Sequence, residues 1–237
     1  MTKIPFYIGT FAACFVPSSH KRHVVRGWVN GILYFPRIFM LIWEIYGKFA
    51  YKIRFVRQHS PDRCVCVVND KYYVKIFKRV PVKKLKAFGV LTDYIAPYIR
   101  VAIPQIYVGK ISNVYVCEKL QGHSIYDFDK KLVLKHHRKI ENQVAKIIDD
   151  LQKINVKKIP NWRQYMTALQ SNDAEKITSK SVLGHFDLNE TNFLFDDNLN
   201  ICGLIDWDGL RITNDKNKDM QIFMKYWNRY KELAKKS

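Results

Sequence analysis

Residues 184–208 constrain this chain more than any other stretch, because they combine polar side chains at fixed spacing with short apolar runs. The polar positions are His185, Asp187, Asn192 and Asp206. The apolar runs and the acidic turn between them predict two short strands, 192–195 and 200–205. A hairpin of this kind brings the polar side chains on either side of it close together.

Phosphoryl transfer from ATP needs few covalent partners but strict positioning of its groups. It requires a carboxylate that accepts the hydroxyl proton, together with oxygen ligands for magnesium. Asp187 can serve as the base, while Asn192 and Asp206 offer oxygens to a cation. The alternative is that these Asp and Asn residues only form solvated turns. The joint match of spacing and apolar runs favours phosphoryl transfer.

The same residues closely resemble the catalytic loop and metal motif of the aminoglycoside phosphotransferase and choline kinase superfamily, distant relatives of protein kinases. The resemblance implies ATP and Mg²⁺ as cofactors and Asp187 as the catalytic base. It also implies Asn192 and Asp206 as metal ligands and His185 as a support of the loop. The Asp-Trp-Asp that starts at Asp206 replaces the Asp-Phe-Gly of protein kinases and favours the small-molecule branch.

The resemblance extends into the first half of the chain. Lys75, within Tyr-Tyr-Val-Lys-Ile-Phe, resembles the strand lysine that contacts ATP phosphates in kinases, although most strand lysines face solvent. The segment 116–122 resembles the hinge between kinase lobes. There, backbone groups of Glu118 and Leu120 are expected to meet adenine.

Two features of the family pattern are absent from the sequence. Residues 58–62, where a turn should cover the phosphates, contain no glycine. The helix predicted over 82–98 contains no Glu to pair with Lys75, and its one acidic residue is Asp93. We therefore expect Asp93, another acid or a different contact to hold the lysine.

Local patterns predict a sheet-rich first half and a helical second half. Two β-branched and aromatic runs joined by an Asn-Asp turn predict a hairpin over 63–77, and a second hairpin is expected over 106–117. The helix over 82–98 lies between them, and apolar residues at helical spacing in 144–151 belong to the helical half. With the resemblance, these patterns predict an α+β, two-lobed protein-kinase-like fold with a small antiparallel-sheet N-lobe and a mainly helical C-lobe. The expected parts are an N-terminal arm over 1–55, an N-lobe over 56–118 and a C-lobe over 119–237.

The formal charge is +19, which predicts attraction to nucleic acid, an anionic membrane surface or a phosphorylated substrate. Residues 1–60 carry nine Lys or Arg and one acid, Glu44. The aromatic segment 28–43 suits a helix in an anionic membrane interface, or equally a segment that packs on the main domain. The apolar run 4–16 is too short to span a bilayer, which takes about 20 residues.

The five cysteines are widely scattered and fit neither a disulfide framework nor a paired zinc site. We therefore expect a cytoplasmic protein, with peripheral attachment to the inner face of a membrane as an option. Cys64 and Cys66 are expected to be small core residues of a strand.

The acceptor is expected to be a hydroxyl of a lipopolysaccharide or other glycolipid sugar. The chain is short for an aminoglycoside or choline kinase, and its size resembles that of kinases acting on heptose or Kdo in lipopolysaccharide cores. A basic arm would hold such an enzyme at the membrane. The alternative acceptor is a soluble alcohol such as choline or an aminoglycoside.

Two hypotheses in which the protein is not an enzyme also remain open. One is a polyanion-binding protein that uses the Lys-rich stretch 71–86, although the chain has no known nucleic-acid-binding motif and nucleic acid is not the expected partner. The other is a kinase-like scaffold that has lost catalysis, as the missing glycines of 58–62 suggest.

Overall fold

The computed structural model describes residues 25, 36, 38–55, 63–77, 82–109, 114–159 and 178–236. The chain divides into two compact units, and each is described by itself. The first is formed by Met1–Gly89 and Gln105–Lys119, and the second by Val90–Pro104 and Leu120–Ser237. The apolar run 4–16, the turn at 58–62 and most of the segment 28–43 lie outside the described residues.

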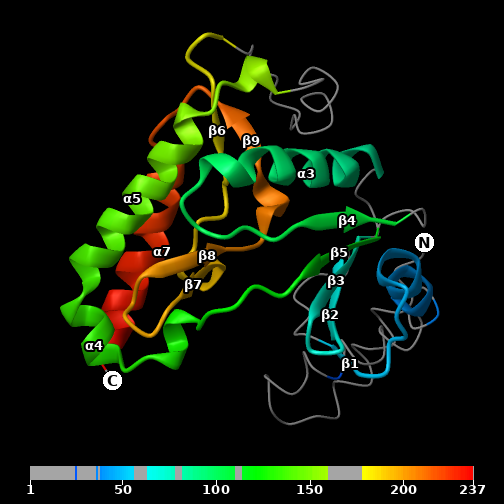
Figure 1. The fold of residues 1–237 in the computed structure, drawn as a ribbon. Helices are drawn as coiled ribbons and strands as arrows, with labels where there is room; N and C mark the ends of the chain where they lie inside the picture. The colour runs from blue at the N-terminus through cyan, green and yellow to red at the C-terminus, as the bar shows by residue number, and fades with distance from the viewer. Residues whose placement is uncertain are drawn as a thin grey trace. The chain divides into compact units, whose positions relative to one another are not determined.

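The first unit contains a five-stranded antiparallel sheet (Figure 1). Its order is β1 (Ile53–Phe55), β2 (Arg63–Val68), β3 (Tyr72–Phe77), β5 (Val114–Glu118) and β4 (Ile106–Val108). Both predicted hairpins are present. Asn69 and Asp70 join β2 to β3 with positive φ angles of 52° and 56°, the backbone that a two-residue hairpin turn matched to strand twist requires.

One face of this sheet carries the core of the first unit. Residues 38–46 form a helix (drawn in blue in Figure 1) whose inner side chains, Ile38, Leu41 and Ile42, are fully buried against it. The sheet contributes side chains at alternate positions, because successive residues of a strand point to opposite faces. The buried residues on the sheet are Cys66, Val68, Tyr72, Val74, Ile76 and Val116. Cys66 is thus a core residue, as predicted, while the side chain of Cys64 lies outside the described part of the structure.

The second unit contains most of the helices. These are the end of α3 (Val82–Ile95), which begins in the first unit, then α4 (Lys130–Lys135), α5 (His137–Lys153) and α7 (Lys218–Lys235). Its strands form two small antiparallel ladders, β6 (Val182–Gly184) with β9 (Arg211–Thr213), and β7 (Phe193–Phe195) with β8 (Ile201–Leu204). Short 3₁₀ turns are η1 (Ala96–Tyr98), η2 (Ile125–Asp127), η3 (Val156–Lys158), η4 (Glu190–Asn192) and η5 (Trp207–Gly209).

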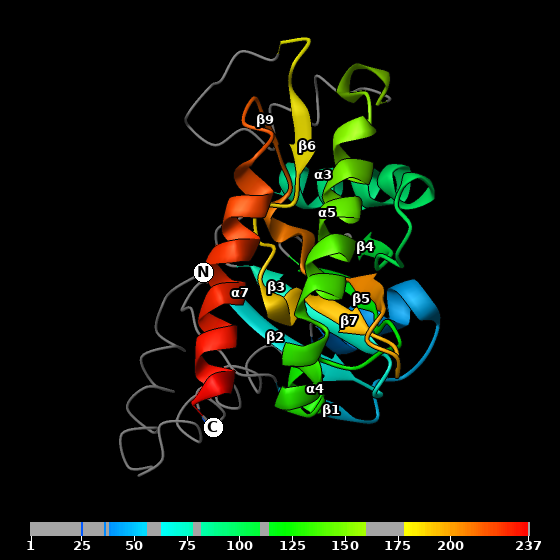
Figure 2. The ribbon, with the colours of Figure 1, turned by 90° about the vertical axis from the view of Figure 1, so that its left-hand side faces the viewer.

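Helices α5 and α7 run side by side in the second unit (Figures 1 and 2). The apolar stripe of α5 is buried as its helical spacing predicts; its members are Ile140, Val144, Ile147, Ile148 and Leu151. Across the helix pair, the indole Nε1 of Trp227 donates to Oε1 of Glu141 at 2.8 Å, and Nζ of Lys231 donates to the same oxygen at 2.8 Å. Glu141 therefore ties α5 to α7 at a partly buried position.

These elements confirm the predicted α+β fold with an antiparallel sheet first and a mainly helical part after it. The predicted helix over 82–98 ends as an α-helix at Ile95 and continues as η1. Pro97 explains this change, because a proline disfavours α-helical backbone at the residue before it. Within the described ranges, no helix is long and apolar enough to span a membrane.

Candidate active site

The segment after β6 is anchored by a buried carboxylate of helix α7. Asp219, in the first turn of α7, is 4% exposed. Its Oδ2 accepts the backbone N–H of His185 and its Oδ1 accepts that of Phe186, both at 2.8 Å. Burial raises the pKa of Asp219, and the two backbone hydrogen bonds act in the opposite direction. The start of the segment is therefore fixed by both oxygens of one side chain.

The His185 ring is fully buried and uses both of its nitrogens. The backbone N–H of Asp187 donates to Nδ1 at 3.3 Å. Nδ1 is therefore unprotonated, and Nε2–H donates to the carbonyl oxygen of Ile205 at 3.1 Å. The ring also lies edge-on to Trp207, with 4.8 Å between ring centroids. His185 thus connects the segment of Asp187 to the residue that precedes Asp206.

Two side-chain amides hold the carboxylate of Asp187. Nδ2 of Asn189 donates to Oδ1 at 3.0 Å, and Nδ2 of Asn192 donates to Oδ2 at 3.2 Å. The same nitrogen of Asn192 also donates to the backbone carbonyl of Asp187 at 2.7 Å. Both carboxylate oxygens are therefore held by side-chain amides, and a base fixed in one orientation is what phosphoryl transfer requires.

Asp206 follows β8 and enters the site from the second ladder. The backbone N–H of Ile205 donates to the carbonyl oxygen of Asn192 at 2.9 Å, which joins the end of η4 to the residue that precedes Asp206. Trp207 is buried, and its Nε1 donates to the carbonyl oxygen of Leu204 at 2.9 Å. The turn that carries Asp206 is therefore tied to its own strand by the next side chain.

Two residues with strained backbone lie next to Asp187 and at the predicted metal position. Phe186 and Asp206 are non-glycine residues with φ angles of 61° and 63°, in the left-handed region. Such conformations cost about 1–2 kcal/mol for most residues and persist where surrounding contacts enforce them. Gly209 adds a close approach, because a Cβ there would lie 2.6 Å from the carbonyl oxygen of His185.

A second group of contacts also joins the segment of Asp187 to helix α7. The hydroxyl of Tyr126 donates to Oε1 of Glu190 at 2.7 Å, and its ring meets Tyr230 edge-on, with 5.5 Å between centroids. Tyr230 stacks in turn on Trp227 at 5.2 Å. These contacts link Glu190, within the segment of Asp187, to helix α7.

The remaining predicted site residues lie on β3, at the end of β5 and just after it. Lys75 stands on β3 between buried Val74 and Ile76 and so points to the sheet face opposite the core. It is half-buried, and its Nζ lies 5.5 Å from the centroid of the Tyr115 ring. Glu118 ends β5 and is exposed. Leu120, half-buried, belongs to the second unit.

The structure therefore brings His185, Asp187, Asn192 and Asp206 together within the second unit. Lys75 and Glu118 belong to the first unit. Asp93 lies in the part of α3 that belongs to the second unit, and burial raises its pKa.

Oxygen ligands of the predicted metal site fit magnesium. Among the described residues, no three His, Cys, Asp or Glu side chains converge as a metal-binding group. Magnesium at phosphoryl-transfer sites takes only one or two protein ligands, because substrate phosphates and water supply the others. Asn192 commits its Nδ2 to Asp187, so its Oδ1 is the side-chain atom that a cation would use. Asp206 would supply a carboxylate.

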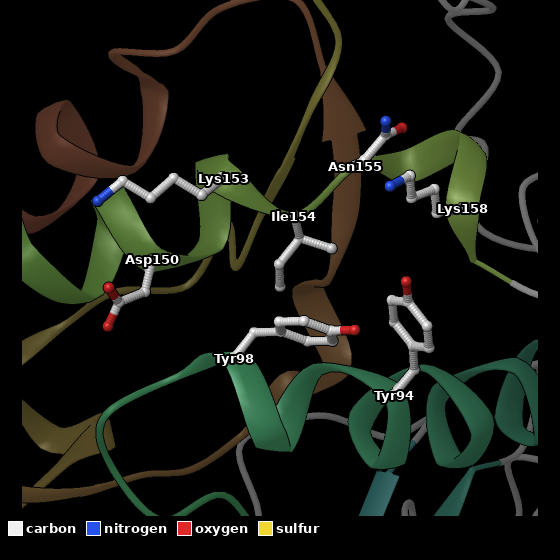
Figure 3. Close-up of a pocket in the computed structure, with 7 residues that line it drawn as sticks. All are labelled: Tyr94, Tyr98, Asp150, Lys153, Ile154, Asn155 and Lys158. Atoms are coloured by element: carbon white, nitrogen blue, oxygen red, sulfur yellow. The ribbon is translucent and has the colours of Figure 1, made fainter.

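A cavity of about 370 Å³ lies elsewhere in the second unit, between the end of α3 with η1 and the end of α5 with η3. Figure 3 shows the side chains of Tyr98 and Ile154 directed toward one another across it. Its lining residues are Tyr94, Tyr98, Asp150, Lys153, Ile154, Asn155 and Lys158. None of the predicted site residues lines this cavity.

Asp219 and Asn189 also belong to the site, although the sequence pattern did not point to them. An Asp in the first turn of a helix is ordinarily an exposed partner of the helix dipole, so only the packing of α7 against β6 shows that Asp219 is buried. Asn189 lies inside the motif, and its position two residues after Asp187 was the available signal.

Comparison with protein families gives a match to the phosphotransferase enzyme family over residues 159–214, a range that includes all four residues of the motif. A comparison with curated proteins gives no match.

Solved structures with a similar fold are aminoglycoside and macrolide phosphotransferases. The GDP and kanamycin complex of APH(2")-IIia has a TM-score of 0.61 and 17% identity, covering 85% of this chain and 83% of that chain. APH(3'')-Id from Streptomyces rimosus gives 0.54 and 15%, with 85% and 89% covered. Macrolide 2'-phosphotransferase MphH from Brachybacterium faecium gives 0.51 and 16%, with 77% of each chain covered. These folds confirm the predicted resemblance to aminoglycoside phosphotransferases and the predicted kinase-like fold, and the family match over residues 159–214 supports the predicted phosphotransferase class.

Proposed function

We propose that this chain transfers the γ-phosphate of ATP to a hydroxyl group, with Asp187 as the base that accepts the hydroxyl proton. The observation that carries this proposal is the carboxylate of Asp187, which is held by the amides of Asn189 and Asn192. The segment around it is anchored by Asp219 and His185. Positioning of this kind is what phosphoryl transfer requires of a protein.

Magnesium would be bound by Asn192 and Asp206. When bound, the ion neutralises charge on the phosphate oxygens of the nucleotide. The protein's contribution is to tie the end of η4, which carries Asn192, to the residue that precedes Asp206, through the backbone hydrogen bond between Ile205 and Asn192. Asn192 also donates to Asp187, so this ligand lies beside the proposed base.

The nucleotide would be bound by Lys75 and by the backbone of Glu118 and Leu120. A half-buried lysine on the face opposite the core is suited to phosphate oxygens. Structures of similar fold are described as complexes with GDP, ADP and ATP. We propose ATP as the phosphate donor of this chain, and GTP is tested as an alternative donor in the same transfer assay.

The proposed acceptor is a hydroxyl of a lipopolysaccharide or other glycolipid sugar. The net charge of +19 supports an acceptor that carries anionic groups or lies among anionic lipids. The runner-up is a soluble aminoglycoside, since similar folds are described with kanamycin and streptomycin. Choline is a third acceptor of the same alcohol class.

The test measures phosphate transfer from radiolabelled ATP, in the presence of magnesium, to lipopolysaccharide core, kanamycin and choline in parallel. Asp187→Asn is the control, because it keeps the size of the side chain and removes the base. We expect transfer to the glycolipid and a loss in the variant of about 10²–10⁴-fold in kcat. Transfer to kanamycin alone would show that the acceptor is an aminoglycoside and not a glycolipid sugar. Equal turnover by Asp187→Asn and wild type would show that Asp187 is not the base.

A further inference from the structure

The first unit exposes a group of large apolar side chains that its core does not use. Their exposed fractions are 52% for Met40, 50% for Trp43, 59% for Phe49 and 79% for Tyr51. All four stand within twelve consecutive residues of the sequence. Three of the four are aromatic, and we call the surface formed by all four side chains the aromatic face.

The helix that carries Met40 and Trp43 is fixed on its other side. Ile38, Leu41 and Ile42 are fully buried in the core of the first unit, so the helix cannot turn its outer residues inward. The helix stops at Gly47, whose N–H donates to the carbonyl oxygen of Trp43 at 2.9 Å and whose φ is +59°. This glycine turn reverses the chain.

The reversal returns Phe49 to Trp43. Their ring centroids are 4.6 Å apart, and the centroids of Phe39 and Phe49 are 5.5 Å apart. Aromatic contacts at these separations are favourable. The rings therefore form one continuous apolar surface, although Phe49 and Trp43 both remain at least half exposed.

The segment 49–52 is held in place by the buried side chain of Asn69. Its Oδ1 accepts the backbone N–H groups of Tyr51 and Lys52 at 3.0 and 3.1 Å. Its Nδ2 donates to the carbonyl oxygen of Phe49 at 2.8 Å. Three hydrogen bonds from one buried residue keep this segment in a fixed conformation, so Phe49 and Tyr51 are presented outward on a rigid support.

Basic side chains stand directly beside the aromatic face. A hollow of about 500 Å³ is lined by Lys48 and Lys71 together with Phe49, Tyr51 and their neighbours. Lys52 lies close by and pairs with Asp70 at 2.6 Å. Exposed aromatic rings next to lysines match the boundary of a bilayer, where rings enter the headgroup region and lysines meet lipid phosphates.

We propose that the aromatic face, with Lys48 and Lys71 beside it, binds the surface of a bilayer that contains anionic phospholipids. Charge complementarity selects this occupant, because Lys48 and Lys71 line the hollow that Phe49 and Tyr51 share, and the chain carries a formal charge of +19. The inference concerns binding alone and does not depend on which acceptor the active site uses.

The first experiment compares sedimentation of the full chain with vesicles of phosphatidylcholine alone and of phosphatidylcholine with phosphatidylglycerol in equal parts. The double variant Trp43→Ser, Phe49→Ser lowers the partition coefficient by about tenfold or more, because it removes two interfacial rings. The variant Lys48→Gln, Lys71→Gln weakens binding to the anionic vesicles only. The matched control Tyr98→Ser, Leu233→Ser changes residues that are 55% and 58% exposed in the second unit and leaves binding unchanged.

A second measurement reports on Trp43 itself, so that binding through another segment is not mistaken for binding here. Trp207 and Trp227 are buried, and Trp28 and Trp162 are replaced by Phe. Emission of Trp43 should then shift to shorter wavelength with anionic vesicles and be quenched by brominated lipid. Unchanged emission while the chain sediments with vesicles would overturn the proposal.

The same face could instead bury itself against a second copy of the chain. In that case the Trp43→Ser, Phe49→Ser variant would change the sedimentation velocity of the protein without lipid, while neither protein would bind vesicles. That result also overturns the proposal. Thermal unfolding of each variant verifies that the first unit remains folded.

Discussion

The carboxylate of Asp219 accepts the backbone N–H of His185 at 2.8 Å, across 34 positions of sequence. A second oxygen of the same carboxylate accepts the N–H of Phe186. The backbone conformation at the start of the Asp187 segment is therefore set by a helix that follows it in the chain.

Asp219→Asn should destabilise the second unit by about 1–3 kcal/mol, because an amide cannot accept both N–H groups and leaves one buried donor unpaired. Burial raises the pKa of Asp219, so its contribution to stability is largest below the ordinary carboxyl value and declines as pH rises through the raised value. The stability difference between wild type and variant should shrink over that rise. Urea unfolding across the acidic range measures it, and a pH-independent difference would contradict the assignment.

Asn189→Ala should lower kcat about fivefold at unchanged KM for nucleotide, because it removes a hydrogen bond of about 1 kcal/mol to the carboxylate of Asp187. Oδ1 of Asn189 also accepts the N–H of Thr191 at 3.0 Å, so the alanine variant loses a turn contact as well. Asn189→Asp is the matched control. It keeps that acceptor but sets a second carboxylate beside Asp187, and it should lower kcat further with a smaller loss of stability.

Gly209→Ala should destabilise the second unit by about 1–3 kcal/mol, as overpacking does. The added Cβ would lie 2.6 Å from the carbonyl oxygen of His185, and backbone atoms must move to admit it. Gly47→Ala is the comparison, because nothing lies within 4 Å of a Cβ at that position and only its φ of +59° opposes the change. Thermal unfolding measures the loss of stability in each variant. A transfer assay then distinguishes them, since only Gly209→Ala should also reduce phosphate transfer.

The pair formed by Arg100 and Asp150 should contribute stability at neutral pH and none in strong acid. The guanidinium donates to both carboxylate oxygens at 2.7 Å and lowers the pKa of Asp150. A lowered carboxyl pKa stabilises the folded state above the ordinary value, and the effect is lost as pH falls through the lowered value. Arg100→Gln should therefore unfold at lower temperature than wild type at neutral pH, and the two curves should converge in acid.

Local patterns were sufficient to predict the elements whose contacts lie close in the sequence. The hairpin over 63–77 and the stripe of α5 follow from residue types at spacings of two and of three or four. The pairing of β6 with β9 could not be predicted in this way, because each strand has three residues and its partner lies far along the chain. The burial of Asp219 has the same origin, since it depends on where α7 packs.

The candidate site likewise contains residues that local spacing predicts and contacts that it does not predict. Residue spacing identified His185, Asp187, Asn192 and Asp206, which the structure brings together. The hydrogen bonds that give them their orientation come from Asn189, Ile205 and Asp219. The contact of Ile205 uses a backbone carbonyl, and Asp219 lies 34 residues from His185. Neither contact can be predicted from residue types near the motif.

The left-handed backbone at Phe186 and Asp206 has an evolutionary consequence. Glycine at either position would relieve about 1 kcal/mol of backbone strain, so selection for heat resistance alone does not explain the residues found there. Each such change would erode the geometry around Asp187. Selection for the rate of phosphate transfer should keep Phe186 and Asp206, whereas selection for stability would favour glycine at the same two positions.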